Sequence, residues 1–581
     1  MKASLSQLRD SAWKHAACWI VILTMSSQAF GQSSKISPDL QAVGSNSNVN
    51  VIVQYFNPPS SNELNAANLV GAANGKGLGL VKAYRWTLSP GKVPQLVSQD
   101  PNIKYVSLDR PLKGAMNYAV PAVNADVAHN LGYDGTGVGV AVIDSGVNPV
   151  FDLTLAGNSK TSRIVYSQNF DPSANTTSDW YGHGTHVSGI IAGNGGSSTC
   201  GNCDVTFRGI APNANIINLR VLDSNGSASD STAIAAIQQA ISLKNQYNIR
   251  VINLSLGRGV FESYTLDPLC QAVEQAWKAG IVVVVAAGNY GRDNSNNNYG
   301  YGTITAPGND PYVITVGAMK TMGTATRTDD LIATYSSKGP TMVDQIIKPD
   351  IVAPGNLVIS DLASTTATLY VNYPQNLLPF SYYTTSNNQN ASSNYYILSG
   401  TSMAAPMVSG AAALLLQQNP LLTPDQVKAR LMKTAYKTFP SSSSYTDPST
   451  GITYTDYYDI FTVGAGYLDV LAALSNSDLA DGTAGSALSP TAVFSSSTNQ
   501  VYMSSGSSVI WGKSTTWGTT VVWGTSVVWG MTASGQSVLW GASTSCWDNS
   551  TSTAFTVIWG NHALWGHSSA TADAILAGAE K

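Results

Sequence analysis

At residues 398–406 the chain reads Leu-Ser-Gly-Thr-Ser-Met-Ala-Ala-Pro, and this stretch opens an apolar, alanine-rich run that continues to Leu416. Small side chains predict a closely packed, buried helix, and Pro406 is tolerated in its first turn, where a backbone N–H has no intrahelical partner. Ser402 is therefore expected at a helix N-terminus, where free N–H groups and the helix dipole favour an oxyanion. Such a serine is either an ordinary helix cap or a nucleophile, and a base elsewhere in the chain decides between the two.

From Gly135 onward, strands rich in β-branched residues alternate with helices. The predicted strands are Val138–Ile143, Ile216–Leu222, Val251–Leu256, Ile281–Ala286 and Val313–Val316, and the predicted helices are His186–Ala192, Ser231–Asn245, Asp267–Ala279 and Pro424–Ala435. Near-continuous apolar strands separated by helices predict an α/β fold whose parallel sheet is covered on both faces. In such folds the functional site lies beyond the carboxyl ends of the strands.

Three polar residues stand where that site is expected. Asp144 directly follows a predicted strand, His183 precedes a helix of small residues, and Asn289 follows another strand through Gly288. A carboxylate at the end of a buried strand is costly unless it has partners. Each residue alone is equally explained as a capping Asp, a surface His or a turn Asn. Together with Ser402 they match an orienting acid, a base, an oxyanion donor and a nucleophile.

The sequence around these residues resembles the signatures of the subtilisin-like serine proteases. The matching motifs are Ala141-Val142-Ile143-Asp144-Ser145-Gly146, Gly182-His183-Gly184-Thr185-His186-Val187-Ser188-Gly189 and Gly400-Thr401-Ser402-Met403-Ala404-Ala405-Pro406. The order Asp, His, Ser is that of subtilisin itself, so the roles in the triad follow from the resemblance. The resemblance covers roughly Val120–Leu474. It implies a subtilisin-like three-layer parallel sheet and a serine endopeptidase that works through an acyl-enzyme.

The same resemblance implies where a protein or peptide substrate binds. Gly226-Ser227-Ala228 and Ser255-Leu256-Gly257 would flank the substrate backbone as two edge strands, and an extended peptide would pair with them through main-chain hydrogen bonds. Ala286, Ala287 and Gly288 would line the primary specificity pocket, where small residues favour a neutral or hydrophobic side chain. Thr305 falls where the family often keeps glycine at the pocket floor, which leaves the pocket depth open.

The N-terminal region is predicted to direct export. Lys2, Arg9 and Lys14 precede an apolar core, Ala16–Met25, and the small-x-small site Ala29-Phe30-Gly31 follows it. This pattern is typical of a cleaved signal peptide, here residues 1–31. The core is too short for a comfortable membrane span. We therefore expect a secreted, extracellular protein, attached to a cell surface if its C-terminal region binds one.

The remaining chain divides by composition. Residues 32–116 are predicted to be a small α+β domain with a connecting segment, which more weakly resembles the inhibitory and chaperone prodomain of the family and implies a self-processing zymogen. The catalytic domain is expected at 117–475, followed by a Ser/Gly-rich linker at 476–500. In 501–581 the pair Trp-Gly recurs from Trp511, predicting a β-type repeat module. Its indoles either contact a cell surface or polymer, or stack as core.

Composition and cysteine content narrow the classes of function. Only 11% of the 581 residues are charged and the net charge is −4, which gives no indication of a nucleic-acid partner. After the signal peptide, the cysteines are Cys200, Cys203, Cys270 and Cys546. The first two could be a redox pair, half a zinc site or a loop-closing disulfide, and their Gly/Ser-rich surroundings favour the disulfide. Cys270 is expected to be a buried free thiol.

Two segments depart from the family pattern. Asn194–Arg208 replaces a family calcium loop with a segment that has one carboxylate, Asp204, and Asp152 alone resembles a family ligand, whereas calcium takes several oxygen ligands. No metal or cofactor is expected for the chemistry, and a structural calcium ion stays an open alternative. Asp361–Asn394 is expected to be a long surface loop. The alternative to an active protease is a surface binding or structural protein with an inactive subtilase domain.

Overall fold

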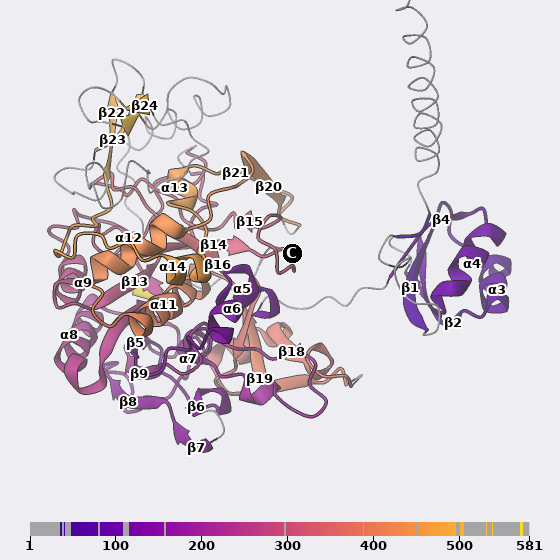
Figure 1. The fold of residues 1–581 in the computed structure, drawn as a ribbon, viewed down its shortest axis with the longest axis horizontal. Coiled ribbons are helices and arrows are strands. Elements are labelled where there is room, and N and C mark those ends of the chain that lie inside the picture. The colour runs from indigo at the N-terminus through magenta and orange to yellow at the C-terminus, as the bar shows by residue number, and fades with distance from the viewer. Residues whose placement is uncertain are drawn as a thin grey trace, which may run out of the picture. The chain divides into compact units, whose positions relative to one another are not determined.

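The computed structural model describes residues 35–37, 40, 48–78, 82–108, 116–155, 158–295, 298–386, 388–448, 450–495, 500–504, 530–531, 537–538, 570–572 and 580 (Figure 1). The chain forms two compact units, Met1–Leu112 and Lys113–Lys581. The predicted signal peptide lies outside the described residues. Among the helices that are described, none is long and apolar enough to cross a membrane.

The smaller unit is an antiparallel sheet packed against two helices. Its strands β1 (Val49–Tyr55), β2 (Ala73–Leu78), β3 (Ala83–Leu88) and β4 (Ile103–Leu108) lie in the order β2-β3-β1-β4, with helices α3 (Ser61–Val70) and α4 (Val93–Gln99) and the short 3-10 helix η2 (Pro90–Lys92). A capping box between Ser60 and Glu63 starts α3. Alternate residues of β1, including Val51 and Val53, are fully buried, so one face of the sheet forms the core. This unit thus combines one antiparallel sheet with helices, an α+β arrangement.

The larger unit is built on an eight-stranded, mainly parallel sheet. The order is β15-β14-β13-β11-β5-β9-β8, with β16 beside β14, and only the pair β14–β15 is antiparallel. The strands are β5 (Gly139–Asp144), β8 (Ile164–Asn169), β9 (Asn215–Arg220), β11 (Ile249–Leu254), β13 (Val282–Ala286), β14 (Ile314–Lys320), β15 (Leu331–Ile332) and β16 (Ile351–Pro354). Every residue of β5, β13 and β14 is buried, as near-continuous apolar strands predict. The predicted α/β parallel sheet is confirmed.

Helices cover this sheet. They are α5 (Met116–Ala122), α6 (Ala125–Asn130), α7 (Gly184–Ala192), α8 (Asp230–Tyr247), α9 (Pro268–Lys278), α11 (Thr401–Gln418), α12 (Pro424–Thr434), α13 (Ile460–Val463) and α14 (Val470–Ser475). Helix α8 packs against α9, α7 packs against α11, and both pairs contact the strands (Figure 1). Helix α11 is buried from Thr401 to Leu416, which confirms the predicted alanine-rich core helix.

Residues 476–495 do not form the predicted linker. Gln426 in α12 donates to the Ala480 carbonyl oxygen at 2.9 Å, and the Ala487 N–H donates to the Asp425 carboxylate at 2.7 Å. Ser489 donates its hydroxyl proton to Asp350 at 2.5 Å. Because this segment supplies hydrogen-bond donors to buried carboxylates, it is part of the folded unit. Its Ser/Ala/Gly composition is nevertheless typical of a linker.

Asp361–Asn394 is not a plain surface loop. Strands β17 (Val358–Asp361), β18 (Leu377–Pro379) and β19 (Ala391–Leu398) form a small sheet in the order β17-β19-β18, together with α10 (Thr368–Asn372) and the 3-10 helices η5 (Pro374–Asn376) and η6 (Phe380–Tyr382). Tyr383, Tyr395 and Tyr396 are buried. Tyrosines in this segment and directly after it therefore build a local core.

Short strands complete the larger unit. The pairs β6 (Thr154–Leu155) with β7 (Asn158–Ser162) and β20 (Ser442–Thr446) with β21 (Thr453–Tyr457) are antiparallel, and β22 (Thr491–Ser495), β23 (Gln500–Ser504), β25 (Ser537–Val538) and β24 (Gly530–Met531) follow one another in a further small sheet. The Trp-Gly repeat otherwise falls outside the described residues. Strand β26 (Ala570–Ala572) lies between β10 (Ser227–Ala228) and β12 (Leu256–Gly257).

The described cysteines are in the states predicted from the sequence. Cys200 and Cys203 form the expected disulfide, Cys270 is a buried free thiol, and Cys546 lies outside the described residues. Burial raises the pKa of Cys270 well above its usual value, so this thiol is unreactive.

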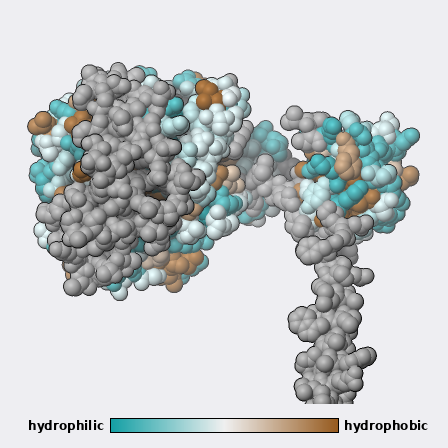
Figure 2. Space-filling model, turned by 90° about the horizontal axis from the view of Figure 1, so that it is seen from above, coloured by the Kyte–Doolittle hydropathy of each residue, from teal (hydrophilic) through white to brown (hydrophobic). Residues whose placement is uncertain are grey.

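On the face shown in Figure 2, the hydrophobic residues that are visible are interspersed with hydrophilic ones. Single exposed hydrophobic residues of this kind need no special explanation.

Candidate active site

Three neighbouring strands end at one edge of the sheet and bring the predicted site residues there. Asp144 is the last residue of β5, Ser255 follows β11 directly, and Asn289 comes three residues after β13. These strands are adjacent and parallel, in the order β13-β11-β5. Their carboxyl ends therefore share one edge, the position expected for a site in this kind of sheet.

Asp144 and His183 form a buried pair. The His183 Nδ1 and the Asp144 Oδ1 are 2.8 Å apart, and the side chains are 0% and 1% exposed. The same carboxylate oxygen accepts the Ser145 N–H at 2.7 Å. A hydrogen bond from Nδ1–H to a carboxylate fixes the tautomer in which Nε2 carries the lone pair. His183 is thus prepared to accept a proton at Nε2.

The turn that carries His183 is held by a residue that sequence reasoning missed, Asp179. Its carboxylate accepts the Gly182 N–H at 2.7 Å, the Thr185 N–H at 2.8 Å and the Ser145 hydroxyl at 2.8 Å. Asp179 is buried, and burial raises its pKa. The only sequence signal was a carboxylate four residues before His183, which is too common to single out.

Ser402 lies in the first turn of α11 and is completely buried by its surroundings. Its hydroxyl donates to the Ser255 carbonyl oxygen at 3.0 Å, and the Ser255 hydroxyl donates to the Ser402 carbonyl oxygen at 2.9 Å. These reciprocal bonds attach the start of α11 to the end of β11. Transfer of the Ser402 proton to His183 requires the hydroxyl to turn away from Ser255.

Asn289 is fixed to the same helix start. Its Oδ1 accepts the Thr401 N–H at 2.9 Å and the Thr401 hydroxyl at 3.2 Å. Among the described residues, the buried Nδ2 of Asn289 has no hydrogen-bond partner. An amide held through its oxygen while its N–H groups stay unused in a buried site is suited to stabilise a negative charge that develops beside Ser402.

The predicted pocket residues adjoin this site. Ala286 and Ala287 are fully buried. The Gly288 N–H donates to the Thr401 hydroxyl at 3.1 Å, and Gly288 has a positive φ of 103°. A Cβ atom at Gly288 would lie 2.7 Å from the Thr305 Cγ2, so only glycine fits there. Thr305 therefore lies directly against the wall that the sequence assigned to the pocket.

The two predicted substrate-flanking strands are also brought to this edge. Leu256 and Gly257 form β12 and follow Ser255, which contacts Ser402. Ser227 and Ala228 form β10 after Gly226, whose φ of 77° suits glycine. Both strands are two residues long and pair with β26 rather than with one another.

The second histidine of the motif, His186, has a different environment. It is fully buried, and its Nε2 lies 3.2 Å from the Val358 carbonyl oxygen and 3.1 Å from the Tyr396 carbonyl oxygen. Burial lowers the pKa of His186 to about 3, so the ring is neutral and donates from Nε2. It joins α7 to the small sheet β17-β19-β18.

Beside the segment Asn194–Arg208, a buried guanidinium binds several backbone carbonyl groups. Buried Arg163 donates to the carbonyl oxygens of Asp152 at 2.7 Å, Thr154 at 3.0 Å and Ala214 at 2.8 Å. The Asp152 carboxylate accepts the Ser197 N–H at 2.6 Å and the Tyr395 hydroxyl at 2.8 Å. These oxygens already have protein donors, so this donor set does not fit a calcium ion. Nor do the described residues contain a group of three or more His, Cys, Asp and Glu that could hold a metal.

Comparisons with known proteins show which family this chain is similar to. A family model described as "Subtilase family" matches residues 135–466. "Serine protease AprX" of Bacillus subtilis (strain 168) is 38% identical over 355 residues, which cover 59% of this chain and 72% of the relative. "Subtilisin E" of the same organism is 34% identical over 295 residues, which cover 50% of this chain and 66% of the relative. A solved structure described as a "cold adapted subtilisin-like serine proteinase" is 29% identical, with a TM-score of 0.37, and the alignment covers 52% of this chain and 84% of that chain.

Proposed function

Because this chain belongs to the subtilase family and is a serine-type endopeptidase, we propose that Ser402, His183 and Asp144 are its catalytic triad. The observation that carries the proposal is the buried His183–Asp144 pair at 2.8 Å, positioned at the same sheet edge as Ser402. Ser402 Oγ attacks the carbonyl carbon of the substrate while His183 Nε2 takes its proton. Asp144 holds the ring and stabilises the imidazolium that forms.

The remaining steps follow from the same three residues. His183 returns its proton to the leaving amine, which departs and leaves an ester between Ser402 and the acyl part of the substrate. A water molecule then attacks the ester, His183 accepts the water proton, and Ser402 is regenerated as the acid product leaves. Throughout, Asn289 Nδ2 donates to the oxyanion of each tetrahedral intermediate. This assignment of Asn289 rests on its unused amide N–H groups.

The substrate class is an extended peptide bound between β10 and β12. Gly226, Ser227 and Ala228 would pair with one edge of its backbone, and Ser255, Leu256 and Gly257 with the other. Ala286, Ala287 and Gly288 would surround the side chain before the cleaved bond. Because Thr305 lies against Gly288, we expect this pocket to be shallow and to prefer small or medium neutral side chains.

A fluorophosphonate probe tests the triad directly. It should label the wild-type serine, and Ser402→Ala should lose both labelling and casein hydrolysis. Ser409→Ala is the matched control, because Ser409 lies in the same helix and donates only to Asn253 at 2.8 Å. This control should keep labelling and activity. Undiminished proteolysis by Ser402→Ala would remove the assignment.

We further propose that the protein is secreted and made as a zymogen that cleaves itself between Leu112 and Val120. The proposal is supported by the signal-like N-terminus and by the separate α+β unit that ends at Leu112. The Ser402→Ala chain should accumulate uncut at this junction. N-terminal sequencing that found the same cut in Ser402→Ala would assign the processing to another protease. The intact site disfavours the alternative of an inactive domain.

A further inference from the structure

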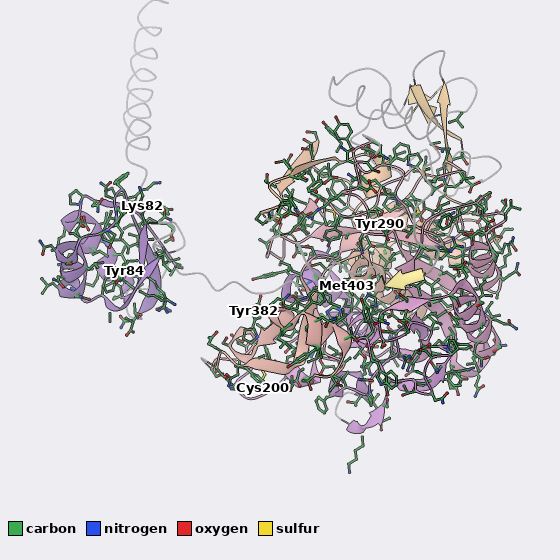
Figure 3. The ribbon with its side chains drawn as sticks, turned by 180° about the vertical axis from the view of Figure 1, so that it is seen from behind. Lys82, Tyr84, Cys200, Tyr290, Tyr382 and Met403 are labelled. Atoms are coloured by element: carbon green, nitrogen blue, oxygen red, sulfur yellow. A yellow bond between two sulfur atoms is a disulfide. The ribbon has the colours of Figure 1, made fainter. Side chains whose placement is uncertain are left out.

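The position between the two predicted substrate-flanking strands is filled by a segment of the same chain. Strand β26 pairs antiparallel with β10 on one side, where Thr571 lies opposite Ser227, and with β12 on the other, where Thr571 lies opposite Gly257. The three-stranded sheet has the order β10-β26-β12. Figure 3 shows this yellow strand near Met403, the residue after Ser402.

The register directs this segment toward the catalytic serine. Ala572 lies opposite Leu256, and Leu256 follows Ser255, whose carbonyl oxygen accepts the Ser402 hydroxyl at 3.0 Å. Because β26 and β12 are antiparallel, the chain direction of β26 leads from Gly257 toward Ser255. In a peptide substrate bound in this direction, the residue that follows the one paired with Leu256 would lie beside Ser255. The carbonyl group of that residue would then be the one closest to Ser402.

A second contact is made by Glu580, eight residues after Ala572 in the sequence. Glu580 is 1% exposed, and its carboxylate accepts the Thr334 N–H at 2.7 Å, pairs with Arg292 at 3.0 Å and forms an ion pair with Lys320. Asn356 donates its side-chain amide to the Glu580 carbonyl oxygen at 2.6 Å and accepts the Glu580 N–H at 3.2 Å. A carboxylate this well buried and paired is a specific attachment point.

Both contacts adjoin the start of α11. The β26 contact reaches it through Ser255, as described above. Glu580 bonds to Asn356, and the preceding residue, Gly355, contacts the start of α11. The Gly355 carbonyl oxygen accepts the Gly400 N–H at 2.8 Å. The chain from Ala572 to Glu580 can span at most about 26–29 Å when fully extended. The two contacts are therefore close enough in sequence for one short stretch of chain to make both.

We propose that strand β26, residues 570–572, is an intramolecular ligand of the substrate cleft, which excludes peptide substrates by occupying the strand position between β10 and β12, and that Glu580 helps to hold it there. This proposal rests on the proposed function, because that function identifies the position as the substrate cleft. The ligand is held by backbone pairing at 570–572 and by the Glu580 carboxylate. Only one strand can occupy the position at a time, so binding of the segment and binding of substrate compete.

The first test measures hydrolysis of a short neutral peptide p-nitroanilide by the full chain. Thr571→Pro should break the pairing, because proline lacks an N–H and Thr571 is paired on both sides. Glu580→Gln should weaken the second contact. Each variant should lower KM by roughly tenfold at unchanged kcat, the change expected if the cleft is free in about a tenth of wild-type molecules. Ser568→Pro, which precedes the paired residues, is the control and should behave as wild type.

The second test does not depend on catalysis. In the full Ser402→Ala chain, amide hydrogen exchange should show protection of peptides that cover Ser227–Ala228, Leu256–Gly257 and 570–572. Thr571→Pro in that background should remove the protection at all three places together. If 570–572 exchange as fast as an unfolded peptide, or if Thr571→Pro changes nothing, the proposal is overturned.

The outcomes separate this proposal from the proposed function. Equal KM values for wild type, Thr571→Pro and Glu580→Gln would overturn the intramolecular ligand and leave the protease assignment intact. Absence of peptide hydrolysis and of fluorophosphonate labelling in every variant would instead reject the protease assignment, while hydrogen exchange would still decide whether the segment is bound. A wild-type mass that ends near Asp573, not found for Ser402→Ala, would show that the segment is a self-cleaved substrate and would overturn the inhibition.

Discussion

The role of residues 478–504 can be tested with two shortened chains, one ending at Ser477 and the other at Ser504. Both lack everything after Ser504, including 570–580, so their difference reports only on residues 478–504, which contain most of the linker predicted at 476–500. Both should carry Ser402→Ala to prevent self-digestion. We expect the longer chain to fold and the shorter chain to be strongly destabilised.

The magnitude follows from the partners that the shorter chain would lose. Asp425 would lose the Ala487 N–H, Asp350 would lose the Ser489 hydroxyl, and the Ile347 N–H would lose the Pro490 carbonyl oxygen. The residues that lose a partner are all buried: Asp425 is 1% exposed, and Asp350 and Ile347 are 0% exposed. Loss of a hydrogen bond to a buried polar group costs about 1–3 kcal/mol, which gives about 3–9 kcal/mol for three. Asp425 keeps its bond from Trp277 and Asp350 keeps its pair with Lys348, which places the loss toward the lower limit. Water that enters the vacated space would reduce this toward the lower limit. Domains are usually stable by only about 5–15 kcal/mol.

Urea unfolding followed by tryptophan fluorescence is the measurement, with Ser489→Ala in the longer chain as an intermediate case. The Ser489 hydroxyl oxygen also accepts a hydrogen bond from the buried Lys428 Nζ at 2.8 Å, so this variant should lose about 1–3 kcal/mol. Equal unfolding midpoints for the chains ending at Ser477 and Ser504 would refute the reasoning. They would mean that water replaces these contacts at no cost and that the predicted linker was correct.

Three further results are expected. Asn289→Ala should leave KM nearly unchanged and lower kcat by roughly 10²–10³-fold, the loss seen when subtilisin itself loses this donor, and an unchanged kcat in steady-state assays would exclude Asn289 from the oxyanion site. Burial raises the pKa of Asp310 to about 8. Between about pH 4 and pH 8 the folded state therefore keeps a proton on this carboxyl group, whereas the unfolded state has released it. The free energy of unfolding consequently falls as the pH rises through this range. Asp310→Asn in the Ser402→Ala background should flatten this dependence in thermal unfolding, and an identical pH profile would contradict it. Replacing both Cys200 and Cys203 by serine should cost about 2 kcal/mol at most, because the disulfide closes a loop of only four residues; a larger loss in urea unfolding would show that the bridge acts on the folded state.

The parallel sheet and the residues at its edge could be predicted from sequence because their signals are local. Apolar β-branched runs indicate buried strands, and Asp144, His183 and Ser402 each lie in a short motif tied to a strand end or helix start. The attachments of these residues could not be predicted. Asp179 supports the His183 turn, and Ser255 binds Ser402 from 147 residues away, through contacts that only the folded chain creates.

Amino-acid composition gave wrong predictions for segments whose contacts are made by residues far away in the sequence. Ser489 sits in a stretch of Ser, Ala and Gly, but its hydroxyl completes a buried cluster with Asp350 and Lys428. Asp361–Asn394 was expected to be a surface loop, yet Tyr383 within it is buried against the ring of Tyr395. Ala570-Thr571-Ala572 has no hydrophobic pattern, because its pairing is through the backbone.

The guanidinium of Arg163 has a consequence for how the protein responds to its medium. A bound ion stabilises a fold by an amount that depends on its free concentration, and it is lost when a chelator removes it. Arg163 is covalently part of the chain, and although burial lowers its pKa to about 10, it remains charged at neutral pH. Its contacts to the carbonyl groups of Asp152, Thr154 and Ala214 therefore cannot be diluted away. This region of the molecule should keep the same stability whether the surroundings are rich or poor in divalent ions.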